Sequence, residues 1–307
     1  MQPVISERPE QVQLSNPRSD RVKAVARLSG RSARLRAGRF VVEGPQAVRE
    51  AVAHTVERRQ YPIDGRNSPA GVVRELYATG EAAQRYPEIL ESAAAAGIFA
   101  RPVSDEVLAA MLAEGGTLSP QGLLAVCDLI TVDLEPVLAA APALVAVLSQ
   151  VRDPGNAGTV IRASDAAGAD AVLLTDASVD VHNPKAVRAT AGSLFHLPVV
   201  AGVPLPDALA GLRAAGLRVL AADGAGAIDL DDLSDQAETD PDALLAGPVA
   251  WVFGNEAWGL PAEDAALADA VVRVPVHGRA ESLNLATAAT VCLYATARAQ
   301  RRAARRR

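Results

Sequence analysis

The second half of the chain alternates short apolar runs with helical stretches, and this alternation constrains the fold more than any other feature. Six such runs stand between residues 144 and 276: LVAVLSQ, AVLLT, LPVV, RVLAA, VAWVF and VVRVPV. Runs of this length separated by helical sequence are typical of strands in a mostly parallel sheet that helices cover on both faces. We therefore predict an α/β domain over residues 143–307, which ends in an alanine-rich helix from Ser282 to about Arg302.

The first half predicts a second, smaller α/β domain over residues 18–133. Its segment RVKAVARLSGRSARLRAG has the character of two short helices, RFVVEG of a strand and PQAVREAVAHTV of a helix. Three further strands are expected at VVRELYAT, GIFARPV and GLLAVCDL. Polar residues 1–17, which contain prolines, are expected to be a disordered arm, and residues 134–142 a linker between the domains.

Charge is distributed unevenly along the chain. The net charge is −6, yet residues 18–59 hold eleven basic residues against four acidic ones, and residues 298–307 hold six arginines and no acid. Residues 223–242 hold eight acids and no base. Basic clusters bind phosphate backbones, so the first segment predicts a nucleic-acid-binding surface with Arg31, Arg34, Arg36 and Arg39 at its centre. A solvated helix face is the alternative interpretation.

Other features exclude several classes of protein. The first residues do not resemble a signal peptide, and no window approaches the roughly 18 uncharged apolar residues of a membrane span. Cys127 and Cys292 each lie in an apolar run, which indicates reduced core thiols and a cytoplasmic protein. The four histidines are scattered and the cysteines lack metal-ligand spacing, so we expect no metal.

The first of three unusual strand ends is LVAVLSQ followed by VRDPGNAGTVIRAS. Pro154 and Gly155 predict a turn, Asn156 a helix cap, and Gly158 a close backbone approach. Arg162 lies one helical turn after Gly158 on the same face. A helix start with a basic residue one turn further on suits an anionic or ribose-phosphate ligand, although a capped helix with an exposed arginine has the same sequence.

The other two junctions also place polar groups where strands end. Gly254 permits a sharp turn after VAWVF, so Asn255 and Glu256 are expected to face whatever lies at the strand tips. In VPVHGRAESLNLATAA, Ser282 is expected to cap the terminal helix, with Asn284 near its first turn. A helix cap alone would explain the last junction.

Taken together, the three junctions resemble, in order and spacing, the three motifs of the SpoU family within the SPOUT methyltransferases, the TrmH-type RNA 2′-O-ribose methyltransferases. The resemblance covers roughly residues 143–300. Upstream, RSARLRAGRFVVEGPQAVREA looks like the substrate-binding domain of many members, which has a ribosomal-protein-like RNA-binding fold. One departure is Val276, where members often have methionine; both residues are apolar.

The resemblance implies transfer of a methyl group from S-adenosylmethionine to a ribose 2′-hydroxyl of RNA. It also implies a deep trefoil knot, which periodicity alone would not reveal, and a homodimer that completes each active site across its two-fold interface. By position, the cofactor would be held by Gly254, Asn255, Val274, Pro275 and Leu283. The polar site would consist of Asn156, Arg162, Glu256, Ser282 and Asn284.

The substrate RNA is left open by these motifs. A distinct N-terminal domain favours ribosomal RNA of the large subunit (23S type), including methylation of the thiostrepton-resistance kind, over transfer RNA. A non-catalytic RNA-binding protein of the same fold is a further alternative. An oxidoreductase is suggested only by DGAGAID after RVLAA, where Asp229 stands in place of a glycine that a dinucleotide fingerprint needs.

Overall fold

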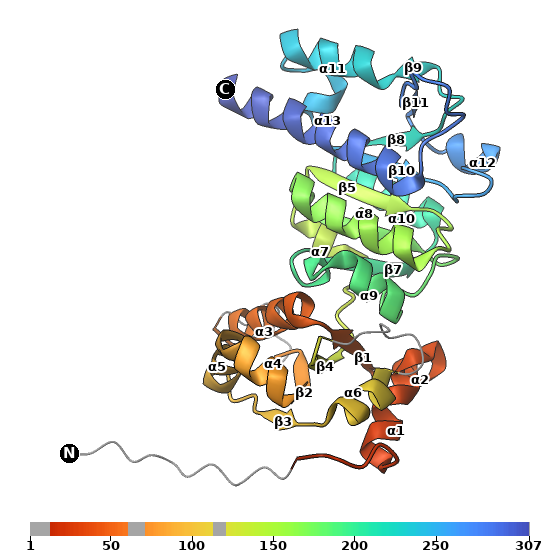
Figure 1. The fold of residues 1–307 in the computed structure, drawn as a ribbon. Helices are drawn as coiled ribbons and strands as arrows, with labels where there is room; N and C mark the ends of the chain where they lie inside the picture. Colours follow the sequence, from red (N-terminus) through yellow and green to blue (C-terminus); the bar gives the residue numbers. More distant parts are fainter. Residues whose placement is uncertain (1–12, 61–70, 113–120, 307) are drawn as a thin grey trace. The chain divides into compact units, whose positions relative to one another are not determined.

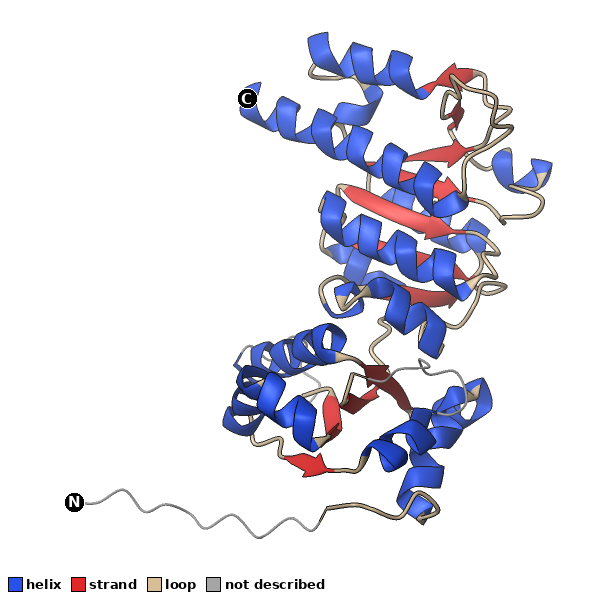
Figure 2. Cartoon of the chain, viewed as in Figure 1, coloured by secondary structure: helices blue, strands red, loops and turns tan. Residues whose placement is uncertain are grey.

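The computed structural model describes residues 13–60, 71–112 and 121–306. The chain divides into two compact units, Met1–Leu129 and Ile130–Arg307 (Figure 1). Each unit has its own sheet and its own helices (Figure 2). The predicted combination of a smaller N-terminal α/β unit and a larger C-terminal one is confirmed.

The first unit is built on a mixed four-stranded sheet of order β1-β4-β2-β3. β4 pairs antiparallel with β1 and β2, whereas β3 joins β2 in parallel. The strands are β1 (Arg39–Glu43), β2 (Val73–Ala78), β3 (Ala100–Pro102) and β4 (Leu123–Asp128). The helices are α1 (Asp20–Ala26), the 3₁₀ turn η1 (Arg27–Ser29), α2 (Arg31–Ala37), α3 (Pro45–Gln60), α4 (Gly80–Arg85), α5 (Pro87–Ala95) and α6 (Asp105–Leu112).

Apolar side chains on one face of this sheet form a core with α1 and α6. Val25 of α1 and Leu108 of α6 pack with Leu124 and Val126 of β4, and all four are buried. Ser19 begins α1 by accepting a hydrogen bond from the backbone N–H of Val22, and Gly38 ends α2 with a positive φ of 63°. The four strands predicted here, and the helices predicted around them, are confirmed.

Two segments differ from the expected arm and linker. Residues 1–12 of the expected disordered arm lie outside the described residues. Leu14, also assigned to the arm, donates its backbone N–H to the carbonyl oxygen of Pro102 in β3 at 2.9 Å and is therefore ordered. Residues 134–139 of the expected linker form helix α7 (Leu134–Ala139) within the second unit. Val137 of α7 is buried in that unit's core, because the apolar residues of the segment lie at helical spacing.

The second unit contains a fully parallel seven-stranded sheet of order β7-β6-β5-β10-β8-β11-β9. Its strands are β5 (Leu144–Leu148), β6 (Ala171–Thr175), β7 (Val199–Val203), β8 (Arg218–Ala222), β9 (Ile228–Asp229), β10 (Val249–Phe253) and β11 (Ala270–Arg273). The remaining helices are α8 (Pro154–Ala167), α9 (Pro184–Thr190), η2 (Ser193–Phe195), α10 (Leu205–Ala214), α11 (Leu230–Thr239), η3 (Leu244–Ala246), α12 (Ala262–Ala265) and α13 (Leu285–Arg306).

Both faces of this sheet are covered, as predicted (Figure 2). Val145 and Val147 of β5 pack with α7 and α10 in one core. Residues that alternate with those of this core point to the other face, where α8 and α13 lie. There the indole of the fully buried Trp251 in β10 donates its Nε1–H to Oγ1 of Thr296 in α13 at 2.9 Å.

Two further expectations concern the chain as a whole. Both cysteines are buried free thiols, and burial raises the pKa of Cys292 to about 12. None of the helices that the structure describes is long and apolar enough to cross a membrane. The trefoil knot stays a prediction of the family resemblance.

Candidate active site

Asn156 joins the three predicted loops through its side-chain amide. Its Nδ2 donates a hydrogen bond to Oε1 of Glu256 at 3.0 Å. Its Oδ1 accepts one from Nδ2 of Asn284 at 3.1 Å. Because parallel strands carry their carboxyl ends to one edge of a sheet, loops far apart in the sequence converge there. The predicted grouping of these three residues is therefore present, and we call them the polar triad.

Asp153, and not Asn156, caps helix α8. Its Oδ1 accepts a hydrogen bond from the backbone N–H of Asn156 at 2.8 Å, and its Oδ2 accepts one from Nζ of Lys185 at 2.7 Å. The bond from Lys185 holds the pKa of the Asp153 carboxyl below its usual value, despite partial burial. The cap prediction was wrong by three residues, and the side chain of Asn156 is consequently available to the triad.

Gly158 serves the packing of two helices. A Cβ atom at this position would lie 2.4 Å from the backbone oxygen of Ala186 and 2.6 Å from Cβ of Ala189, both in α9. The close approach that we predicted here is therefore made by helix α9, so Gly158 fixes where α8 begins relative to its neighbour.

The loop after β10 is a closed turn from Gly254 to Gly259. Asn255 and Gly259 exchange two backbone hydrogen bonds of 2.9 Å, and Gly259 has a positive φ of 69°. A Cβ at Gly254 would lie 2.4 Å from the carbonyl carbon of Gly259, so only glycine fits beneath the turn. The turn projects Glu256 and Trp258 from the sheet edge as exposed side chains.

The side chain of Asn255 belongs to the structure of this loop. It is buried, its Nδ2 donates to the carbonyl oxygen of Gln150 at 2.7 Å, and its Oδ1 accepts from the N–H of Ala257 at 2.9 Å. Gln150 itself has a positive φ of 55°, a strained conformation for this residue type. The side chain of Asn255 therefore ties the loop after β10 to the loop after β5, and its backbone N–H and C=O both pair with Gly259. The cofactor contact expected for Asn255 stays a prediction.

Asn284 begins the terminal helix. Its Oδ1 accepts a hydrogen bond from the backbone N–H of Ala286 at 2.9 Å, and α13 starts at the next residue, Leu285. Ser282 was predicted to be this cap, but it is exposed two residues before Asn284 and bonds to no described residue. One asparagine therefore both caps α13 and donates to Asn156.

The segment between β11 and α13 has the chemistry to hold S-adenosylmethionine. Within the described part of the chain, the backbone groups of residues 276–283 make no hydrogen bond. Val276 and Leu283 are large apolar side chains with 38% of their surface exposed. Open backbone donors and acceptors beside apolar side chains suit an adenosine group, which has polar edges and apolar faces. Val274 and Pro275, predicted as cofactor contacts, lie at the start of this segment and are half-buried.

Arg162 does not contact the polar triad within its own chain. It is exposed on α8 and makes no hydrogen bond or ion pair with any residue that the structure describes. It lies six positions after Asn156, which is about 9 Å along the helix and roughly a third of a turn around it. Arg162 therefore stands on a different face of α8 from the rest of the predicted site.

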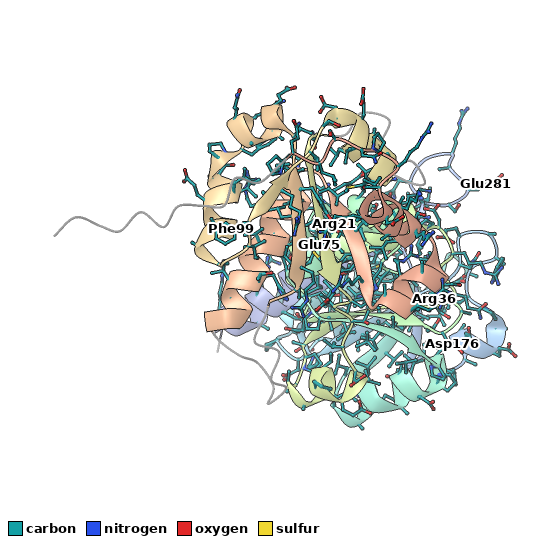
Figure 3. All side chains as sticks on the ribbon, turned by 90° about the horizontal axis from the view of Figure 1, so that it is seen from below. Arg21, Arg36, Glu75, Phe99, Asp176 and Glu281 are labelled. Carbon is teal, nitrogen blue, oxygen red and sulfur yellow. The ribbon has the colours of Figure 1, made fainter. Side chains whose placement is uncertain are left out.

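The four arginines predicted to bind RNA fall into three groups. Arg31 and Arg36 are exposed on α2 (Arg36 is labelled in Figure 3). Arg39 is half-buried and lies 3.7 Å from a carboxylate oxygen of Glu75, which also pairs with Arg21 at 2.8 Å (Figure 3).

Arg34 was predicted to lie on the RNA-binding surface, but its side chain is buried. Only 2% of it is exposed, and Nη1 donates to the carbonyl oxygens of Leu28 and Ser29, at 2.9 Å and 2.5 Å. It satisfies the backbone of η1, where α1 and α2 meet. Because the guanidinium is inside the fold, it is not available to a phosphate.

The basic end of the chain pairs with the acidic middle. Glu238 of α11 accepts hydrogen bonds from Arg298 at 3.0 Å and from Arg302, and Arg306 donates to its backbone oxygen. The arginine run thus fastens α13 to α11. Among the described residues, no group of three or more histidine, cysteine or acidic side chains is placed to hold a metal ion.

Arg152 and Trp258 contribute to this region and were not predicted. Cζ of Arg152 lies 5.1 Å from the centroid of the Trp258 ring. Arg152 belongs to the loop after β5 and Trp258 to the loop after β10, the same two loops that Asn156 and Glu256 join. A tryptophan in a sequence otherwise poor in aromatics, two residues after Glu256, was the signal that could have found this pair.

Comparison with known proteins relates most of the chain to RNA methyltransferases. Residues 143–294 match the model of the SpoU rRNA Methylase family. The chain is 33% identical to the 23S rRNA (guanosine(2553)-2′-O)-methyltransferase RlmP of Bacillus subtilis, over 92% of this chain and 98% of the relative. It is also 33% identical to the 23S rRNA (uridine(2479)-2′-O)-methyltransferase of Streptomyces viridochromogenes, over 89% and 87%.

A solved structure has the same fold over nearly the full length. It is the AdoMet-bound rRNA methyltransferase from Sinorhizobium meliloti, with a TM-score of 0.74, 28% identity and coverage of 94% of this chain and 97% of that one. The family predicted from the three loops is confirmed, and so is the cofactor implied for it. The chain belongs to the SpoU rRNA methylase family.

Proposed function

We propose that the protein transfers a methyl group from S-adenosylmethionine to a ribose 2′-hydroxyl of 23S ribosomal RNA. The observation that carries this proposal is the polar triad, which joins the three loops of the family at one edge of the parallel sheet. Both relatives described above are named as 23S rRNA 2′-O-methyltransferases, and they align with both units of this chain.

Residues of the second unit have separate tasks in this reaction. The segment 274–283 and the backbone at Gly254 would hold S-adenosylmethionine, which supplies a methyl group already activated by its sulfonium. Asn156 holds Glu256 and Asn284 in fixed positions, so the triad presents a preorganised set of donors and acceptors to the ribose. Alignment of this kind is worth up to roughly 7–11 kcal/mol in favourable cases.

The 2′-hydroxyl must lose its proton as the new O–C bond forms. Oε2 of Glu256 has no hydrogen-bond partner among the described residues, so it is free to accept a hydrogen bond from the hydroxyl. A guanidinium stays protonated in proteins and is therefore a poor base. Arg162 therefore positions the hydroxyl or an adjacent phosphate.

Arg162 reaches the triad of a second copy of the chain in a homodimer. Two large apolar side chains, Val291 and Tyr294, expose 40% and 47% of their surface on one face of α13. Tyr294 donates its hydroxyl to the carbonyl oxygen of Ala166 in α8, one turn from Arg162. A dimer that buries this apolar face would bring Arg162 to the interface.

Mixed dimers test this arrangement. Arg162→Ala and Asn156→Ala chains, each inactive alone, should regain activity when they are combined, because one of the two sites then has both residues intact. If the mixture stays inactive although mixed dimers are shown to form, Arg162 acts within its own chain.

The first unit binds the RNA. Arg31 and Arg36 are exposed on α2 and are available to phosphates. Two further basic side chains of the same segment, Lys23 and Arg27, are also exposed.

We expect the reaction to take place in the cytoplasm, since its substrate is ribosomal RNA. The two relatives are named for different nucleotides, a guanosine and a uridine, so the family does not fix the base.

Methyl transfer to unmodified RNA tests the proposal. The protein is incubated with labelled S-adenosylmethionine and either 23S rRNA transcribed in vitro or total transfer RNA, and the product is digested to nucleosides. We expect one 2′-O-methylated nucleoside from the 23S transcript. Label on transfer RNA alone would assign a different substrate, and label on neither, with the cofactor bound, would leave a non-catalytic RNA-binding protein.

A further inference from the structure

One of the two tryptophans of the chain is held at the surface beside the polar triad. Trp251 is fully buried, whereas Trp258 exposes 49% of its surface. The turn that carries Trp258 is closed by two hydrogen bonds between Asn255 and Gly259. The turn is also anchored by the buried side chain of Asn255. The exposed indole therefore stands on a fixed support and loses little freedom when a ligand binds it.

Arg152 places a positive charge on this ring. Its Cζ lies 5.1 Å from the ring centroid, within the range of a cation–π interaction. Its side chain is exposed and makes no ion pair with the acids that the structure describes. The pair thus offers a flat apolar surface and an unneutralised guanidinium side by side.

We propose that Arg152 and Trp258 form a stacking platform for an unpaired base of the RNA substrate. Unpaired bases stack on aromatic rings and on arginine guanidinium planes, whatever the identity of the base. The platform stands on the two loops that Asn156 and Glu256 join, so a base stacked there places its own ribose, or that of its neighbour, near the triad. This inference rests on the proposed function and adds how the substrate nucleotide is held.

The charge of the platform favours RNA over the cofactor. S-adenosylmethionine carries a positive sulfonium, and a second cation beside its binding site would weaken its binding. RNA carries a negative charge at each nucleotide, so Arg152 can contact a phosphate while the base lies on Trp258. The adenine of the cofactor is accounted for by the apolar side chains of Val276 and Leu283.

Variants of the pair should change RNA binding and leave cofactor binding unchanged. Trp258→Ala should raise the KM for a 23S transcript about ten-fold or more, since loss of one stacked base typically costs that much. Trp258→Phe should restore most of the affinity, because a ring remains. Arg152→Ala should weaken binding and flatten its salt dependence. The matched control is Tyr86→Ala, since Arg85 lies 5.5 Å from the centroid of that ring and both residues belong to the first unit.

Fluorescence reports the stacking directly, because the other tryptophan is buried. Unmodified 23S transcript should quench the tryptophan emission of the unchanged protein, and a fully paired RNA duplex should quench it much less. Trp258→Phe should abolish this difference between the two RNAs. This readout needs no turnover. If the protein binds the transcript with quenching but never methylates it, the proposed function fails and the platform stands.

Three results would overturn the platform. The first is a rise in the Kd for S-adenosylmethionine in Trp258→Ala with unchanged RNA affinity, which would assign the ring to the adenine. The second is equal quenching of tryptophan emission by the transcript in the unchanged protein and in Trp258→Phe. The third is an equal loss of RNA affinity in Tyr86→Ala.

Discussion

Asn156 and Glu256 are 100 residues apart in the sequence, and Nδ2 of the first donates a 3.0 Å hydrogen bond to Oε1 of the second. The bond crosses from the start of α8, which follows β5, to the turn after the adjacent parallel strand β10. With Asn284 on the other side of Asn156, the amide connects the ends of three strand–loop segments. A substitution that displaces one of these three segments is therefore expected to displace the site residues of the other two.

Gly254→Ala should disrupt the site without unfolding the unit. The new Cβ would lie 2.4 to 2.6 Å from the backbone of Gly259 and Leu260, so the turn that presents Glu256 must shift. We expect weakened binding of S-adenosylmethionine by calorimetry and at least a hundred-fold lower turnover. Gly247→Ala is the control, since a Cβ there meets nothing within 4 Å. Equal activity of both variants would show that the turn tolerates displacement.

Arg162→Ala should abolish methyl transfer while the Kd for S-adenosylmethionine stays within about three-fold of the original. The reason is that Arg162 is exposed and has no bond to the residues described around the cofactor segment. Arg162→Lys should recover only part of the activity, because an ammonium lacks the planar fork of a guanidinium. Near-normal turnover of a correctly folded Arg162→Ala protein would remove this residue from the site.

Replacing Arg31 and Arg36 together by alanine should weaken RNA binding. Each phosphate contact contributes about 0.7–0.9 to the slope of log K against log salt concentration, so the slope should flatten by about 1 to 2. Cofactor affinity should not change. Arg101→Ala, also exposed in the first unit, is the control. An unchanged slope in the double variant would mean that α2 is only a solvated face.

Thr296→Val tests the buried contact between α13 and the sheet. It leaves the indole N–H of Trp251 without its acceptor, which should lower the free energy of unfolding by about 1–3 kcal/mol in denaturant titrations. Ser164→Ala removes a buried hydroxyl with no hydrogen-bond partner in the described structure, so it should change stability by less than about 0.5 kcal/mol or raise it. If the two variants were equally stable, the Trp251–Thr296 bond would contribute nothing.

Much of the architecture could be predicted because short stretches of the sequence have patterns typical of single strands and helices. Apolar runs such as VAWVF are typical of buried parallel strands, and the carboxyl ends of such strands meet at one edge, so the convergence of Asn156, Glu256 and Asn284 followed. Strand β9, with two residues, was too short to produce a pattern.

The errors arose where several residues could perform the same task. Asp153 and Asn156 are both good helix caps, and backbone geometry selects Asp153. Arg34 has the same local sequence character as Arg31, and only the meeting of η1 and α2 turns it inward. Helix α7 contains a proline, which suggested a linker, but Pro136 lies in its first turn, where proline is tolerated.

The most direct test of the account is the single-turnover rate of 2′-O-methyl formation by Asn156→Ala, with RNA and S-adenosylmethionine both saturating. Because Asn156 holds Glu256 and Asn284 in position, we expect the rate to fall by about a hundred-fold or more. The Kd for the cofactor and the thermal midpoint should stay close to those of the unchanged protein. A rate within a few-fold of the unchanged protein would contradict the claim that the polar triad aligns the ribose for methyl transfer.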